Sequence, residues 1–108
     1  MKENSVQLIG YVGGSPTITT LEGGVKKARL RVATHQLVKK ENDLKKFTTV
    51  WHDVVAWRSV ADYAERSFVK GSHILVDGSL VYRTYPDHSG HVRYVTEIKA
   101  EHLMNLDR

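Results

Sequence analysis

Apolar and polar side chains alternate over the first third of the chain, which predicts strands. Residues 5–12 alternate with a period of two, as a strand with one buried face does. The glycine, serine and proline of residues 13–16 predict a turn, and residues 17–20 can continue the strand. After residues 23–24, a second strand is predicted with one apolar and one cationic face. Ala28, Leu30, Val32 and Thr34 lie on the first face, and Lys27, Arg29 and Arg31 on the second.

The middle of the chain changes character twice. Residues 35–47 are polar and charged without a clear period, which predicts a long loop or a flexible hairpin tip. Residues 48–57 are rich in β-branched and aromatic types and predict a third strand. Ser59 then resembles a helix N-cap, with Asp62 completing an approximate capping box. Apolar residues at helical spacing up to Gly71 predict one short helix.

The last third returns to the strand pattern. Residues 74–82 and 92–98 predict two further strands, joined by a turn at residues 85–90 that contains proline and glycine. A final strand can cover residues 99–106. Three strands, one helix and two strands predict an all-β fold: a five-stranded Greek-key OB-fold barrel with one short α-helix between strands 3 and 4. We expect residues 1–108 to form a single domain.

Composition narrows the class of protein. A chain of 108 residues with 41% hydrophobic and 26% charged residues is typical of one globular domain with a real core. No apolar run approaches the roughly 20 residues needed to span a bilayer. The N-terminal residues carry no apolar signal region, so we expect a cytoplasmic protein. The absence of cysteine excludes disulfides and thiolate metal sites.

The positive charge is concentrated in one part of the sequence. The formal net charge is +4, but residues 25–46 hold eight cations against Glu41 and Asp43. The cations are Lys26, Lys27, Arg29, Arg31, Lys39, Lys40, Lys45 and Lys46. Such a segment can bind a polyanion. It can equally be a solvated edge that lysines protect from aggregation, and charge alone leaves both interpretations open.

Aromatic rings supply the candidate chemistry. Trp51 and Trp57 share a face of the third predicted strand with Asp53 and Val55, roughly 20 Å apart at about 3.3 Å per residue. The opposite face is only half apolar, so the alternation leaves open which face is inside. Tyr85 begins the last turn, close to Arg83, and is expected to be exposed. Exposed rings among cations are what sequence-tolerant binding of unpaired bases requires.

A set of short segments, in order, carries a family resemblance. They are residues 4–10, 15–16, 31–34, 49–57, 70–72, 76–80, 83–90 and 93–98. Each is weak alone, but together they cover nearly the whole chain. The sequence resembles the bacterial single-stranded DNA-binding proteins.

This resemblance implies a set of functional residues. It implies sequence-independent binding and protection of single-stranded DNA in replication, recombination and repair, without enzymatic activity or a cofactor, in the nucleoid. It also implies homotetramers, with a dimer as the alternative. The stacking positions would be Trp51, Trp57 and Tyr85. The phosphate contacts would be Lys27, Arg29, Arg31, Lys39, Lys40, Lys45, Lys46, Lys70 and Arg83, and the subunit interface Val6, Leu8 and His52.

The chain departs from the family pattern in four places. Val38 stands where many relatives have a tryptophan, which should weaken one stacking site. Asp53 occupies a position that is often basic, and a carboxylate there would repel phosphates. Tyr85 replaces a frequent tryptophan but keeps a ring. The sequence ends at residues 105–108 without the acidic tip of its relatives, so we expect a short form without tail-mediated partners.

Other functional classes fit the sequence less well. The six histidines match no zinc signature, so no metal site is expected. His88, Ser89 and His91 lie in a predicted turn without the glycine-rich elbow of a nucleophile or a phosphate loop. A primosomal replication protein of the same fold, usually dimeric, is the nearest alternative. A sugar-binding barrel or a pure interaction module is more remote, and affinity that ignores salt would favour either.

Overall fold

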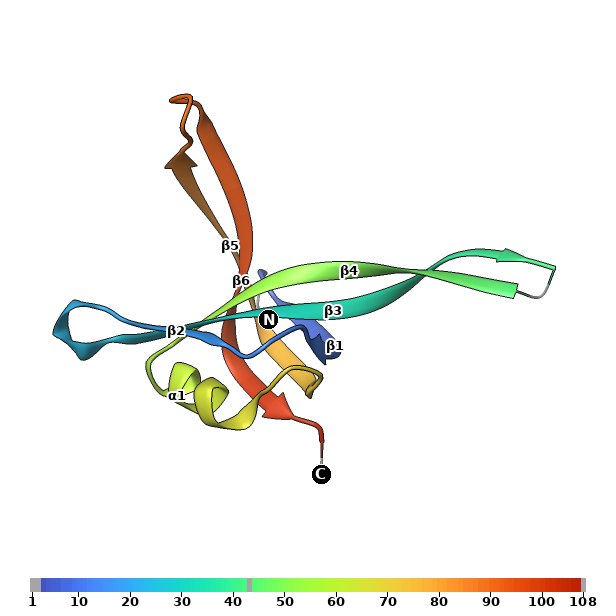
Figure 1. Ribbon diagram of the computed structural model, residues 1–108, viewed down its shortest axis with the longest axis horizontal. Helices are drawn as coiled ribbons and strands as arrows, with labels where there is room; N and C mark the ends of the chain where they lie inside the picture. The colour runs from blue at the N-terminus through green and yellow to red at the C-terminus, as the bar shows by residue number, and fades with distance from the viewer. Residues whose placement is uncertain (1–2, 43, 108) are drawn as a thin grey trace.

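The computed structural model describes residues 3–42 and 44–107, so Asp43 of the basic segment lies outside the described residues. Six strands, one short 3₁₀ helix and one α-helix make up the fold (Figure 1). The strands are β1 (Val6–Val12), β2 (Thr17–Thr20), β3 (Lys26–Glu41), β4 (Leu44–Trp57), β5 (His73–Pro86) and β6 (Val92–Asn105). The helices are η1 (Glu22–Gly24) and α1 (Arg58–Ser67).

Five of these strands close into a barrel. The sheet runs β1-β5-β6-β4-β3-β2, and a further pairing of β1 with β3 joins its ends. Strands β4 and β6 run parallel where Val54 lies beside Ile98, and the other pairs are antiparallel. Strand β2 continues β1 along β3 after the break at residues 13–16. The predicted five-stranded barrel with one helix between its third and fourth barrel strands is confirmed.

The core lies inside the barrel, and α1 covers one end of it (Figure 1). In β3, Ala28, Leu30 and Val32 are buried on the predicted apolar face, whereas β4 buries three consecutive residues, Val54, Val55 and Ala56. Helix α1 contributes Ala61 and Ala64, small residues that allow close approach, and Phe68 follows its last turn. The buried cluster consists of Val12, Ala28, Leu30, Val32, Val54, Ala56, Ala61, Ala64, Phe68, Ile74, Val76, Ile98 and Ala100.

Two long hairpins project from the barrel as arms (Figure 1). Of the two predictions for residues 35–47, the hairpin agrees with the structure and the long loop is wrong, because β3 and β4 stay paired as far as Glu41 and Leu44. Both faces of this arm are exposed, so no apolar period marked it as a strand. The predicted separate strand over 99–106 is also wrong: β6 runs unbroken to Asn105, and a bulge between Asp77 and Gly78 of β5 adjusts its pairing.

The start of α1 differs from the prediction. Ser59 is not the N-cap, since the helix begins at Arg58 after Trp57, with no side-chain cap hydrogen bond. Arg58 has a φ of 55°, a left-handed conformation that non-glycine residues seldom adopt. The chain therefore turns sharply from β4 into α1 directly after one of the two tryptophans.

Candidate nucleic-acid interface

The register of β3 and β4 brings the cationic face and the tryptophan face together. Lys27 lies opposite Trp57, and Ala33 lies opposite Trp51. Because side chains alternate along a strand, the odd-numbered residues between these two pairs point to the same side of the sheet as the tryptophans. Their pairs are Arg29 with Val55 and Arg31 with Asp53. One face of the barrel wall thus carries two indoles and three cations, and we call it the binding face.

Trp51 is open to solvent and Trp57 is partly so, and each ring has a cation above it. Trp51 is 46% exposed, with the Arg31 guanidinium carbon 4.7 Å from its ring centroid. Trp57 is half-buried, with Lys27 Nζ 5.1 Å from its centroid. The alternation left open which face of β4 is inside. The structure places the even-numbered Val54 and Ala56 in the core, together with Val55, so neither tryptophan is sequestered there.

Tyr85 lies on the other projecting hairpin, formed by the ends of β5 and β6, which we call the second arm. It is exposed, as expected, and lies 6.0 Å from the Arg83 guanidinium carbon. Arg83 reaches back to the barrel wall, donating from Nε to Glu97 Oε1 at 3.1 Å. Glu97 also accepts a hydrogen bond from Arg29 of β3. The Arg83 guanidinium beside Tyr85 is therefore linked through Glu97 to Arg29 of the binding face.

Glu97 is a buried carboxylate between these two arginines. Only 5% of the residue is exposed. Burial by itself raises the pKa of its carboxyl, but the hydrogen bonds and charges of Arg29 and Arg83 outweigh that effect and hold the pKa below its ordinary value. The ionised carboxylate thus fixes both guanidinium groups and neutralises part of their charge.

Lys27 and Lys26 differ although they are adjacent in sequence. Desolvation, together with the nearby Arg29, lowers the pKa of Lys27, which lies over Trp57. Lys26 points to the helix instead, 2.7 Å from Glu65 and 3.0 Å from Asp62, and its hydrogen bonds to them raise its pKa. Lys26 is therefore committed to holding α1 against β3, whereas Lys27 belongs to the binding face.

The arm formed by β3 and β4 beyond Thr34 and Val50, which we call the basic arm, places like charges opposite one another. Lys39 pairs with Lys46, and Lys40 with Lys45. Like charges directly across a ladder destabilise it, and only Lys39 has an ion pair on the arm among the described residues, with Glu41 at 3.0 Å. The basic arm thus places two pairs of lysines across from one another on an exposed hairpin.

Sequence reasoning missed one ring on the basic arm. Phe47 is 61% exposed and pairs with Leu37. It lies four residues before Trp51 on the same strand, so alternation puts it on the binding face. Phe47 has an odd number, like Trp51 and Trp57, and this could have placed it on their face. The prediction of a loop or hairpin tip over residues 35–47 left that alternation unused. Two other exposed rings, Tyr82 and Tyr94, alternate to the opposite face of the second arm from Tyr85.

The remaining predicted residues lie apart from the binding face. Lys70 is exposed in the turn after α1, and no contact described for residues 3–42 and 44–107 joins it to the rings. Val6 and Leu8 are half-buried against the core, so the side chains that β1 exposes include Ile9. His52 points away from the tryptophan face, with Nε2 2.9 Å from Thr34 Oγ1.

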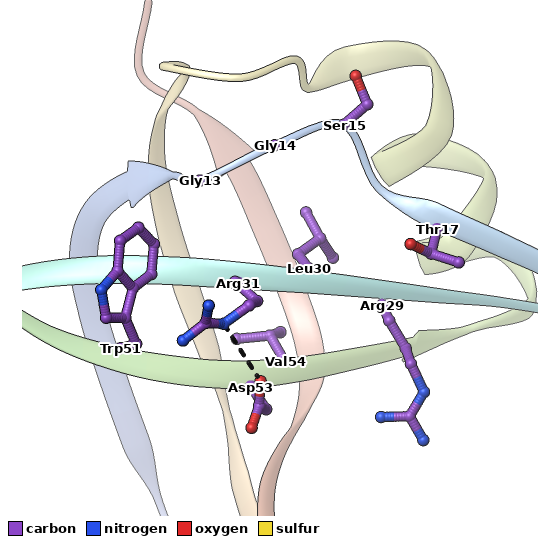
Figure 2. A pocket seen from close by; sticks show the side chains of 10 residues that line it. All are labelled: Gly13, Gly14, Ser15, Thr17, Arg29, Leu30, Arg31, Trp51, Asp53 and Val54. Atoms are coloured by element: carbon purple, nitrogen blue, oxygen red, sulfur yellow. Dashed lines mark ion pairs between the residues drawn. The ribbon is translucent and has the colours of Figure 1, made fainter.

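A pocket of about 420 Å³ opens beside Trp51 (Figure 2). Gly13 forms part of its wall. A Cβ atom at this position would lie 2.6 Å from Cζ3 of Trp51, so only glycine lets the β1–β2 connection come this close to the indole. The pocket is lined by Gly13, Gly14, Ser15, Thr17, Arg29, Leu30, Arg31, Trp51, Asp53 and Val54.

In residues 3–42 and 44–107, histidine, aspartate and glutamate nowhere gather in a group of three that could hold a metal ion. Within the same part of the chain, no helix has the length and apolar character needed to cross a bilayer.

Comparison with known proteins finds relatives over nearly the whole chain. The chain is 36% identical over 106 residues to "Single-stranded DNA-binding protein 1" of Xylella fastidiosa (strain 9a5c), covering 97% of this chain and 78% of the relative. It is 31% identical over 103 residues to a "Single-stranded DNA-binding protein" of Xylella fastidiosa (strain Temecula1 / ATCC 700964), covering 95% of this chain but only 63% of that relative.

A solved structure matches as well. The "Plasmodium falciparum SSB complex with ssDNA" superposes with a TM-score of 0.88 at 31% identity, covering 99% of this chain and 97% of the other. Residues 3–106 match the Single-strand binding protein family. The chain belongs to the single-strand binding protein family.

Proposed function

We propose that this chain binds single-stranded DNA by stacking bases on Trp51, Trp57 and Tyr85 and holding phosphates on the cations beside them. The observation that carries the proposal is the pairing of each of these rings with a cation on one surface. Every base has a π-face and every nucleotide carries a phosphate, so such a surface needs no particular sequence.

Stacking supplies most of the affinity in this proposal. A stacked base contributes about 1–3 kcal/mol, a value that comes from proteins of this kind rather than from this chain. An exposed ion pair contributes about 0–1 kcal/mol. A base that stacks on Trp51 would displace the Arg31 guanidinium from the ring toward the adjacent phosphate.

The phosphate track extends over both arms. We assign contacts to Lys27, Arg29, Arg31 and Arg83 around the rings, to Lys39, Lys40, Lys45 and Lys46 on the basic arm, and to Lys70 as an outlying contact. Phosphates between the facing lysines would remove their mutual repulsion. Val38 on β3 stands where many relatives have a tryptophan. Phe47, on the same side of β4 as Trp51, would offer one further ring near that position. We place this activity in the protection of single strands during replication, recombination and repair, without a chemical step.

The proposed assembly is a homo-oligomer, a tetramer with a dimer as the alternative. Strand β1 is bonded to β5, and only Tyr11 and Val12 also reach β3, so residues 6–10 leave one edge of β1 free for a second copy among the described pairings. A two-fold axis at this edge would pair two β1 strands, with the exposed Ile9 nearby. His52, together with Val6 and Leu8 beneath the edge, is proposed to support that contact.

Fluorescence titration with a long poly(dT) strand tests the stacking proposal. Bound bases should quench the indoles, and the endpoint gives the number of nucleotides per chain. The variants Trp51→Ala and Trp57→Ala each leave one indole, so each reports one site separately. Each should bind about 5- to 150-fold more weakly, the equivalent of one lost stacked base.

A matched control tests whether losing any exposed ring weakens binding. Tyr82→Ala removes an exposed ring from the opposite face of the second arm and should bind poly(dT) as the wild type does. Unchanged affinity in both tryptophan variants would refute the proposal. An equal loss in Tyr82→Ala would mean that the rings act without regard to face.

A further inference from the structure

The pocket beside Trp51 has the size and walls for one nucleobase. Its volume of about 420 Å³ lies near the lower end of the range for small-molecule sites. One wall is the indole, whose edge the backbone at Gly13 approaches closely. Figure 2 shows Arg31 lying between Trp51 and Asp53, so that the polar groups border the same space as the ring.

Asp53 has unused hydrogen-bonding capacity in this pocket. Its Oδ1 lies 3.8 Å from Nε of Arg31, which is an ion pair but too long for a hydrogen bond. Within residues 3–42 and 44–107, the Asp53 carboxylate accepts no hydrogen bond. Both side chains are more than half exposed, so neither is locked by its surroundings. A carboxylate here would repel phosphates, yet it faces the place where a base edge would lie.

We propose that this pocket favours guanine over the other bases, with the Asp53 carboxylate accepting hydrogen bonds from the N1–H and N2–H groups of guanine. The inference rests on the single-stranded DNA binding proposed above and adds one local preference to it. An ionised carboxylate can only accept hydrogen bonds. Guanine alone offers two adjacent donors, one for each carboxylate oxygen.

The other bases fit the carboxylate less well. Adenine and cytosine place a ring nitrogen acceptor beside the amino group, and thymine flanks its one N–H with two carbonyl oxygens. Each of them would bring an acceptor against the second carboxylate oxygen. Arg31, displaced from the indole face, has five N–H donors, so it can hold the adjacent phosphate and still donate to O6, next to N1–H. Trp51 would stack the base while these two side chains contact its edge.

Competition binding with designed strands tests the preference. A fluorescent oligo(dT) bound to the full chain is displaced by unlabelled strands of equal length: all thymine, isolated guanines in thymine, or inosine at those positions. Inosine lacks the N2 amino group but keeps N1–H and O6. The wild type should bind the guanine strand at least about fivefold more tightly than the inosine strand.

The decisive variant is Asp53→Asn. Its side chain keeps the shape but presents one acceptor instead of two, so the guanine-to-inosine affinity ratio should fall to about one. Glu41→Gln is the matched control. It removes the same charge from a similarly exposed carboxylate that is also ion-paired to a cation on β3. The control should bind all strands more tightly and keep the ratio.

The outcomes separate this inference from the proposed function. If the wild type does not bind the all-thymine strand, the proposed function fails. If it binds that strand but shows a guanine-to-inosine ratio of one, the guanine pocket alone is refuted. A ratio that persists in Asp53→Asn would show that Asp53 does not read the base. In a further outcome, the wild type shows a guanine-to-inosine ratio of one while both variants bind every strand more tightly by the same factor. Asp53 would then only lower the positive charge of the surface.

Discussion

Glu97 holds together the centre of the binding face, because it binds one arginine from β3 and one from β5. Its pKa is depressed in the folded protein. A group of this kind stabilises the fold fully above its unfolded pKa, and the stabilisation is lost as the pH falls through the folded pKa. The face is therefore sensitive to acid at one buried carboxylate.

Glu97→Gln tests that dependence. At neutral pH the variant should lose about 1–3 kcal/mol of unfolding free energy, since two charge-assisted hydrogen bonds are weakened. Denaturant unfolding from pH 7 down to pH 3 should show the difference from wild type shrinking below the ordinary glutamate pKa of 4.5. Glu22→Gln, on the exposed η1 segment, serves as control. A difference that stays constant with pH would contradict the assignment.

Some residue roles could be predicted from sequence and others could not. Alternation correctly placed Trp51 with Trp57, and the cationic residues of β3 on one face. It could not say which face of β4 is inside, because Val54 and Val55 are both buried although they point to opposite sides. Glu97 gave no signal, since nothing local marks a glutamate as the partner of arginines from two distant strands.

The basic arm shows how an element can escape sequence analysis. Its strands are held by the backbone ladder and one side-chain contact, between Thr49 Oγ1 and His35 Nδ1 at 3.5 Å, and both faces are exposed and carry lysines as well as apolar residues. Periodicity reports burial, and no face of this arm is buried. The same exposure and the facing lysines would let the arm bind an anionic strand, as proposed above.

Replacing the four facing lysines with glutamine tests the role of the basic arm. The slope of log affinity against log salt should fall by about 0.7 for each lost phosphate contact, so by about 3 if all four contribute. Backbone amides of the arm should exchange more slowly, because the repulsion across Lys39–Lys46 and Lys40–Lys45 is gone. Arg66→Gln on α1 is the control. An unchanged slope would mean that the arm is only solvated.

Phe47→Ala tests whether the arm also stacks a base. We expect affinity for poly(dT) to fall about fivefold or more, without a change in the salt slope, because a ring and not a charge is lost. Leu44 is the matched control, since it is similarly exposed but alternates to the other face of β4. If Leu44→Ala weakens binding as much as Phe47→Ala does, the effect is not stacking.

At the scale of the whole molecule, the free edge of β1 is the feature that an assembly must account for. The order of strands and the position of the helix could be predicted from sequence, because glycine or proline breaks the strand pattern after β1 and at the end of β5, and helical spacing replaces it after β4. Closure of the barrel through β1 and β3 could not, because it depends on pairing across distant parts of the chain.

Ile9→Lys tests the proposed assembly. A charge on the exposed side of β1 should shift the chain toward smaller species, because it would be buried between two copies. Light scattering during gel filtration measures the mass, with the wild type expected at four times the chain mass, or twice for a dimer. Leu21→Lys, an equally simple change at an exposed leucine away from β1, should leave the mass unchanged. Equal masses for wild type and Ile9→Lys would refute this edge as an interface.

The length of the basic arm also determines which part of the protein a passing strand meets first. The molecule measures 57 Å in its longest dimension and 33 Å in its shortest. Screening at physiological salt confines the attraction of a charge to about 8 Å, so lysines gathered near the barrel would search only a thin shell of solvent. Carried outward on a paired hairpin, the same charges sample a wider volume. If the basic arm contacts phosphates as proposed, it would set the rate of encounter, and the rings behind it would set how long a captured strand remains.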